Sequence, residues 1–158
     1  IVCPDNLDVA VDENCAFTLP DYTENATIAD NCSAAVDITV SQSPLSTSLT
    51  VLNAPETITL MAEDGAGNTA NCTFTVTPGD QTSPEIVCPS PQVIYFDTNC
   101  SVDLPDFTGL GTPSDNCTVT GNITVTQTPL EATTYVDLTP PMVTVTLTAE
   151  DESGNMAS

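Results

Sequence analysis

Residues 62–70 read Ala-Glu-Asp-Gly-Ala-Gly-Asn-Thr-Ala, and residues 149–157 repeat them 87 positions later as Ala-Glu-Asp-Glu-Ser-Gly-Asn-Met-Ala. Upstream, Ile-Val-Cys-Pro at residues 1–4 returns at residues 86–89, which is 85 positions later. A nearly fixed period with a two-residue slip is typical of tandem modules. Such modules set length and stiffness, or multiply a weak contact, more often than they catalyse a reaction.

The repeat predicts module 1 at residues 1–79 and module 2 at residues 80–158. The boundary falls in residues 77–84, which carry two prolines that limit flexing. We therefore expect the modules to be arranged end to end. The counterpart of Cys72 would fall just past Ser158, so we also expect module 2 to lack its last strand.

Apolar residues alternate with threonine through much of the chain, as in Thr-Ile-Thr-Leu-Met at residues 57–61. This period of two, with β-branched residues, indicates strands with one face in a core and one in water. Six or seven short strands in about 80 residues favour an immunoglobulin-like β-sandwich. The fold class is thus all-β. In module 1 the expected strands are residues 6–11, 15–19, 35–42, 48–53, 56–63 and 72–77.

The charge balance is one-sided, because 22 carboxylates face no Lys, Arg or His. Repulsion between them must be relieved by water, salt or bound cations. Nucleic acid is excluded as a direct partner, since phosphate contacts need cationic groups. No apolar run is long enough to insert into a membrane. A catalytic nucleophile would lack its usual activating base, so we expect no enzyme.

Seven cysteines in two small β-rich modules indicate an oxidising, extracellular compartment. A zinc site is disfavoured because the chain has no C-x-x-C pair and no histidine. Four cysteines lie in module 1 and three in module 2, and we attribute the odd number to the expected missing strand.

Together, Ile-Val-Cys-Pro at the start, Asp-Asn-Cys at residues 30–32 and the stretch from residue 62 to Val76 resemble the hyalin repeat (HYR). The resemblance covers both modules, and it is greatest to the four-cysteine form found in tandem in large secreted surface proteins of Bacteroidota-type bacteria. It implies an immunoglobulin-like sandwich with adhesive or structural roles outside the cell. It carries no catalytic residues.

Four cysteines allow three connectivities, and the sequence alone leaves them open. In immunoglobulin-like sandwiches the first and last strands lie side by side, which favours Cys3–Cys72. Cys15–Cys32 is then the second bridge of module 1, Cys100–Cys117 is its counterpart in module 2, and Cys88 is left without a partner. The alternative in module 1 is Cys3–Cys15 with Cys32–Cys72.

The segments 64–68 and 151–155 have two interpretations. Asp, Gly and Asn are the residues of tight turns. Their oxygens are also ligands that Ca²⁺ prefers, although the spacing is not that of an EF-hand. Sandwich topology would cluster several such side chains at the module junction. The predicted inter-module calcium ligands are Asp12, Glu13, Asp80, Asp115, Asn116, Asp151 and Asn155.

The sequence therefore predicts a non-catalytic structural segment of a long extracellular adhesin, stalk or filament at the cell surface. Its expected partners are neighbouring repeats of the same chain, with lateral assembly into fibres. The alternative is a calcium-dependent adhesion module that contacts a polysaccharide or protein receptor.

Overall fold

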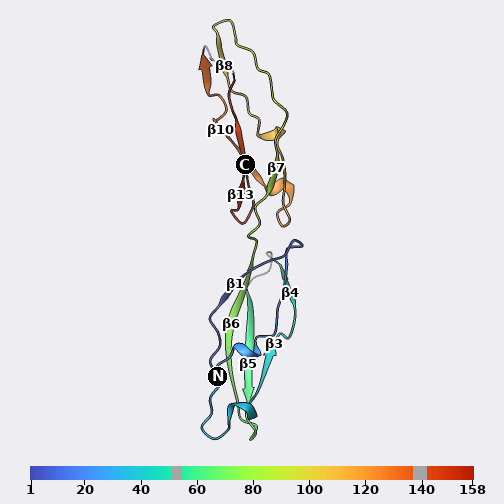
Figure 1. Ribbon diagram of the computed structural model, residues 1–158, viewed down its shortest axis with the longest axis vertical. Helices are drawn as coiled ribbons and strands as arrows, with labels where there is room; N and C mark the ends of the chain where they lie inside the picture. The colour runs from blue at the N-terminus through green and yellow to red at the C-terminus, as the bar shows by residue number, and fades with distance from the viewer. Residues whose placement is uncertain (51–54, 137–141) are drawn as a thin grey trace. The chain divides into compact units, whose positions relative to one another are not determined.

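The computed structural model describes residues 1–50, 55–136 and 142–158, and over these residues the protein is all-β (Figure 1). The helical elements in this part of the chain are four single-turn 3-10 helices. None of the described residues form a helix with the length and apolar character of a membrane span. The chain divides into unit 1, Ile1–Asp80, and unit 2, Gln81–Ser158, one residue beyond the predicted boundary.

Unit 1 is built on a four-stranded sheet with the order β1-β6-β5-β3, accompanied by a β2-β4 pair. The first strand, β1, runs parallel to the last, β6, while β5 pairs with β6 and β3 in antiparallel fashion. The strands are β1 (Leu7–Ala10), β2 (Ala16–Thr18), β3 (Thr39–Ser43), β4 (Ser48–Thr50), β5 (Glu56–Glu63) and β6 (Thr69–Gly79). The short helical turns are η1 (Thr23–Asn25) and η2 (Ala35–Asp37).

The alternation of threonine with apolar residues explains the core of unit 1. In β5, Ile58 and Leu60 have no exposed surface, whereas the threonines on either side face outward. Because successive side chains of a strand point to opposite faces, Ile58, Leu60 and Ala62 share one buried, apolar face of β5. Both sheets contribute to the resulting core, which contains Leu19, Tyr22, Leu49, Ile58, Leu60, Phe74 and Val76.

One predicted strand of unit 1 begins later than expected. Residues 35–37 form η2, where Ile38 donates its N–H to the carbonyl of Ala35, and β3 starts only at Thr39. The alternation in this stretch begins before the backbone becomes extended. Residues 51–53 of the predicted fourth strand lie outside the described part of the chain.

Unit 2 repeats this plan with shorter strands. Its sheets are β10-β12-β13, β11-β8 and β7-β9. The bridge between Val2 and Thr27 in unit 1 returns 85 residues later, where β7 pairs Val87 with Thr112 of β9. The elements are β7 (Glu85–Val87), β8 (Ser101–Asp103), η3 (Thr108–Leu110), β9 (Thr112–Ser114), η4 (Thr120–Asn122), β10 (Thr124–Thr128), β11 (Thr134–Val136), β12 (Thr146–Glu150) and β13 (Met156–Ala157).

A disulfide joins Cys3 to Cys72, with 5.6 Å between their Cα atoms. This is the pair that the sequence favoured, and it excludes the alternative in which Cys3 bonds Cys15. The bridge ties the segment before β1 to β6, which pairs with β1 along its last residues. The first and last strands of unit 1 are therefore held together by hydrogen bonds and by a covalent bond.

The predicted bridge between Cys15 and Cys32 is not formed, because Cys32 is a free, exposed thiol. The two residues lie at opposite ends of unit 1. The loop to Cys15 starts at Val11, which donates its N–H to Gly79 at the end of β6, whereas Cys32 follows Asp30, which lines a hollow with residues 68–70 at the start of β6. The 11 residues of β6 span roughly 35 Å, but a disulfide needs Cα atoms within about 7 Å.

The predicted bridge between Cys100 and Cys117 is absent for the same reason, and Cys100 is free and exposed. Cys100 precedes β8, whereas Cys117 lies in a loop that contacts the turn between β12 and β13. β8 and β13 lie at different ends of unit 2 (Figure 1). Cys88, which the sequence left without a partner, is also a free, exposed thiol.

Candidate functional site

The two acidic stretches that the sequence singled out are tight turns built around one aspartate each. Asp64 Oδ1 accepts the N–H groups of Ala66 and Asn68, both at 2.8 Å, and its Oδ2 accepts the Asn68 amide at 2.9 Å. Asp151 repeats these contacts with Ser153 and Asn155, at 2.8 Å each. Both carboxylates are thus engaged in holding their own turns.

Glycine is required at one position of each turn. Gly67 has φ of +84° and Gly154 has φ of +87°, a region that side chains with a Cβ rarely adopt. This backbone conformation, together with the carboxylate contacts, supports the turn interpretation of residues 64–68 and 151–155. It explains why Asp, Gly and Asn recur in both modules without requiring a metal.

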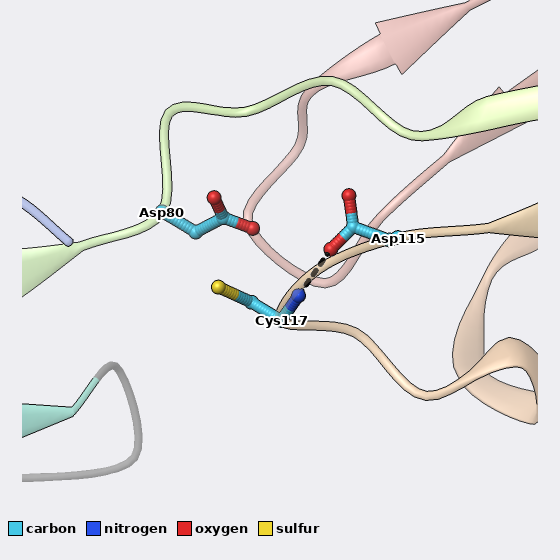
Figure 2. Close-up of side chains that lie close together, drawn as sticks. All are labelled: Asp80, Asp115 and Cys117. Carbon is cyan, nitrogen blue, oxygen red and sulfur yellow. Dashed lines mark hydrogen bonds between the residues drawn. The ribbon is translucent and has the colours of Figure 1, made fainter. Parts of the chain in front are cut away.

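The loop of Asp115 lies at the same end of unit 2 as the Asp151 turn. Thr118 Oγ1 accepts the N–H of Glu152 at 3.2 Å, so the two loops meet, as sandwich topology predicted. Asp115 Oδ2 accepts the N–H groups of Cys117, at 2.7 Å, and Thr118, at 2.8 Å (Figure 2). Its other oxygen, Oδ1, is buried and accepts no hydrogen bond. This oxygen is the strongest candidate for a cation ligand in unit 2.

The predicted calcium ligands of unit 1 differ from one another in burial and in hydrogen bonding. Asp12 Oδ1 accepts the N–H groups of Asn14, at 2.8 Å, and Ala16, at 3.0 Å, and so holds the turn before β2. Glu13 is exposed, and Asp80, the last residue of unit 1, is buried. Asn116 lies next to Asp115 in unit 2. A shared calcium ion between the modules stays a prediction for all of these residues.

Backbone hydrogen bonds lower the pKa of several turn aspartates. The N–H groups of Ala16 and Asn14 lower the pKa of Asp12, and those of Ser101 and Asn99 do the same for Asp97. The pKa of Asp64 is lowered by the side chain of Asn68 and then by the N–H groups of Asn68 and Ala66. In each case the donors stabilise the ionised carboxylate.

These shifts predict that Asp64→Asn destabilises unit 1 in a pH-dependent way. Asp64 has a folded-state pKa below the ordinary value of 3.8, so its charge stabilises the fold above that pH, and the contribution is lost as the pH falls through the lowered pKa. The difference in Tm between wild type and variant should be full at pH 6 and shrink toward pH 2. Thermal unfolding followed by circular dichroism measures it.

Acidification also protonates the other carboxylates and so relieves the repulsion between them. This contribution cancels when each variant is compared with wild type at the same pH. Asp8→Asn removes the same charge from an exposed strand position and serves as the control. Its effect on Tm should be small at every pH. A difference for Asp64→Asn that stays constant between pH 6 and pH 2 would contradict the role given to its ionised carboxylate.

A buried glutamine that the sequence motifs do not single out occurs in both units. Gln42 is 5% exposed, its Oε1 accepts the N–H of Tyr22 at 2.6 Å, and its Nε2 donates to the carbonyls of Pro20 and Pro44, both at 3.0 Å. Gln127, 85 residues later, accepts from Phe107 at 2.7 Å and donates to Pro105 at 3.0 Å. The sequence does hold a signal for this glutamine, since it recurs after 85 residues and stands two positions before a proline in both units.

Unit 1 combines a parallel β1–β6 pair, a disulfide from the first segment to the last strand, and an Asp-x-x-Gly-Asn turn before that strand. Residues 1–78 match the family model of the HYR domain. HYR domains occur in extracellular proteins and are adhesion-type, non-catalytic modules. No curated protein matches the chain.

The HYR match ends two residues before the end of unit 1. It agrees with the resemblance inferred from the cysteine and turn motifs. For unit 1, therefore, the sequence motifs and the family-model match both indicate an HYR-like module. Unit 2 shares its repeated motifs, including the buried glutamine and the turn aspartate.

Proposed function

We propose that this chain is a non-catalytic structural segment of an extracellular cell-surface fibre or stalk, in which immunoglobulin-like sandwiches follow one another in series. One observation carries the proposal. Two pairs of polar residues that recur between the units are engaged in their own scaffold: Asp64 and Asp151 hold turns, and Gln42 and Gln127 tie strands to loops. Recurrent polar groups in an enzyme would converge on a substrate site instead.

Composition supports the same function. The chain has no Lys, Arg or His, so neither a general base of the usual kind nor a cationic clamp is present. The disulfide between Cys3 and Cys72 suits an oxidising compartment outside the cell. The partners that we propose are neighbouring repeats of the same protein, with lateral assembly into fibres.

One observation favours a second candidate, calcium-dependent adhesion to a polysaccharide or protein receptor. Asp115 Oδ1 is a buried carboxylate oxygen without a hydrogen-bond donor, and no Lys or Arg exists to compensate its charge. A buried oxygen of this kind is costly unless a cation or water satisfies it. Ca²⁺ is a suitable cation, because it prefers carboxylate and carbonyl oxygens.

Binding assays in the presence of calcium and of a chelator distinguish the two candidates. For a structural segment we expect the two-unit chain, immobilised on beads, to bind host cells and polysaccharide arrays no better than uncoated beads. For the adhesion module, binding should appear with calcium and be lost with chelator and in Asp115→Asn. Glu131→Gln, an exposed position in unit 2, is the matched control.

The calcium site can be tested apart from adhesion. If Asp115 binds the ion, a hundredfold excess over Kd should stabilise the protein by about 2.7 kcal/mol, and Asp115→Asn should abolish this shift. A Tm that calcium does not change in wild type would remove the calcium site. Calcium-independent binding to cells would instead contradict the structural proposal.

A further inference from the structure

The four-stranded sheet of unit 1 has two edge strands of different character. Its order is β1-β6-β5-β3, so β1 and β3 form the two edges (Figure 1). None of the described strands pairs with the outer side of β3. An edge strand presents unpaired N–H and C=O groups, which can pair with another strand. The side chains along each edge decide whether such pairing is favourable.

Charge protects the β1 edge but not the β3 edge. Asp8 is exposed within β1, and Asp5 is exposed just before this strand. In contrast, β3 reads Thr-Val-Ser-Gln-Ser, and the chain carries no charged residue between Asp37 and Glu56. Natural proteins blunt an open edge with charged residues, proline or a bulge. Residues 39–43 contain none of these features, and they pair with β5 in an unbroken register.

The same uncharged edge recurs in unit 2. Among the described strands of that unit, β10 is an edge of the sheet β10-β12-β13, and it reads Thr-Val-Thr-Gln-Thr. No charged residue lies between Asp115 and Glu131. Both units therefore keep this edge free of carboxylates, although the chain has 22 of them.

This charge pattern indicates which partner the edge suits. A cationic partner would be attracted to the carboxylates elsewhere on the chain, and it gains nothing from a strand without charge. A second copy of the chain is repelled by those carboxylates, because each copy carries a formal charge of −22. It can approach closely only where carboxylates are absent. The uncharged edge thus suits a like-charged partner, which is a second copy of this chain.

The sequence of β3 is also complementary to itself. In an antiparallel pair centred on Ser41, Thr39 of one copy lies opposite Ser43 of the other, and Ser41 lies opposite Ser41. These side chains are exposed and share one face of the strand. Hydroxyl groups both donate and accept hydrogen bonds, so each opposed pair is favourable.

We propose that β3 pairs in antiparallel fashion with β3 of a second copy, so that the two sheets join into one continuous sheet. This inference rests on the proposed function, because it names the surface through which such fibres assemble laterally. A failure of the pairing would leave the role as a structural segment intact, since the adhesion assays test that role separately.

Sedimentation equilibrium of the full chain tests the proposal. Every sample carries Thr126→Asp, which places a charge at the exposed centre of β10, so that only β3 is available for pairing. We expect monomers at 0.01 M salt and reversible dimers at 1 M salt, because the Debye length falls from about 30 Å to about 3 Å. A chain that stays monomeric at about 1 mM protein in 1 M salt would overturn the proposal.

Ser41→Asp tests whether β3 forms the contact. It places two carboxylates opposite one another at the centre of the pair, and it should weaken association at least about tenfold. Thr73→Asp is the matched control. It adds the same charge at an exposed position of β6, two strands from the edge, and should leave association nearly unchanged. Equal effects of the two variants would mean that β3 is not the interface.

A mixture of opposite charges tests the register. Ser41→Lys protein mixed with Ser41→Asp protein should associate at least about tenfold more tightly than Ser41→Asp protein alone, because the two charges then lie opposite one another. The same mixture at Thr73 should give no comparable gain. If folded variants, as judged by Tm, show no rescue at residue 41, the antiparallel pairing is wrong.

Hydrogen exchange locates the contact without any substitution in β3. As the protein concentration rises, amide protection should increase at residues 39–43 and stay unchanged at residues 7–10 of the β1 edge. Added protection confined to other residues would also overturn the proposal.

Discussion

Replacing Cys3 with serine is expected to lower the stability of unit 1 by about 4 kcal/mol. The disulfide to Cys72 closes a loop with a sequence separation of 69 residues, so its removal restores a large conformational freedom to the unfolded chain. The native state also loses the bond that holds the segment before β1 against β6. Urea unfolding of the two-unit chain, followed by circular dichroism, measures the change.

The control for this variant is Cys32→Ser, which removes a free, exposed thiol and should change stability by less than about 0.5 kcal/mol. Cys72→Ser should reproduce the effect of Cys3→Ser, and the double variant should cost no more than either single variant. An unfolding midpoint equal to that of Cys32→Ser would show that the bridge contributes nothing to unit 1.

Replacing Gln42 with leucine should cost about 3 kcal/mol, although the side chain remains similar in size. The change leaves the N–H of Tyr22 and the carbonyls of Pro20 and Pro44 in a part-buried environment without their partner. Each unsatisfied group of this kind costs about 1 kcal/mol or more. Thermal and urea unfolding of the variant measure the loss.

Two further variants define the effect of the buried glutamine. Gln127→Leu should destabilise unit 2 in the same direction, since Gln127 bridges Phe107 and Pro105. Gln81→Leu, at an exposed position of unit 2, should change stability by less than about 0.5 kcal/mol. If Gln42→Leu behaved like Gln81→Leu, the hydrogen bonds of Gln42 would have no net effect on stability.

Much of the strand pattern of unit 1 could be predicted from the sequence. The alternation of threonine and apolar residues gave β5 its observed bounds at residues 56–63, because one buried face repeats every second residue. The adjacency of the first and last strands led to the pairing of Cys3 with Cys72. The local alternation of residue types was sufficient to predict β5, and the general topology of the fold was sufficient to predict the disulfide.

The second disulfide could not be predicted in this way, because it depends on which end of the unit each loop occupies. Cys15 and Cys32 are 17 residues apart in the sequence, which made a local bridge attractive. The segment between them, which contains β2 and η1, carries the chain from one end of unit 1 to the other. Sequence separation was therefore a poor guide to distance.

The sequence predicted which residues belong to the candidate site, but not how each of their carboxylates is hydrogen-bonded. The sequence singled out the segments 64–68 and 151–155, for which both a turn and a calcium site fitted, and it predicted Asp115 as a calcium ligand. Hydrogen-bond geometry separates them, since both oxygens of Asp64 are engaged whereas Asp115 Oδ1 accepts none. Gln42 was missed because a lone glutamine between serines in a strand suggests a solvent-facing residue.

The bond between Cys3 and Cys72 has a mechanical consequence. Tension that enters unit 1 at its first residues and leaves through residues 73–80 passes through this bond, so the residues between the two cysteines lie outside the load path. Only about ten residues can be drawn out while the bond is intact. Reduction would release the rest, adding roughly 230 Å at about 3.4 Å per residue. Unit 1 is thus nearly inextensible when oxidised and a long tether when reduced.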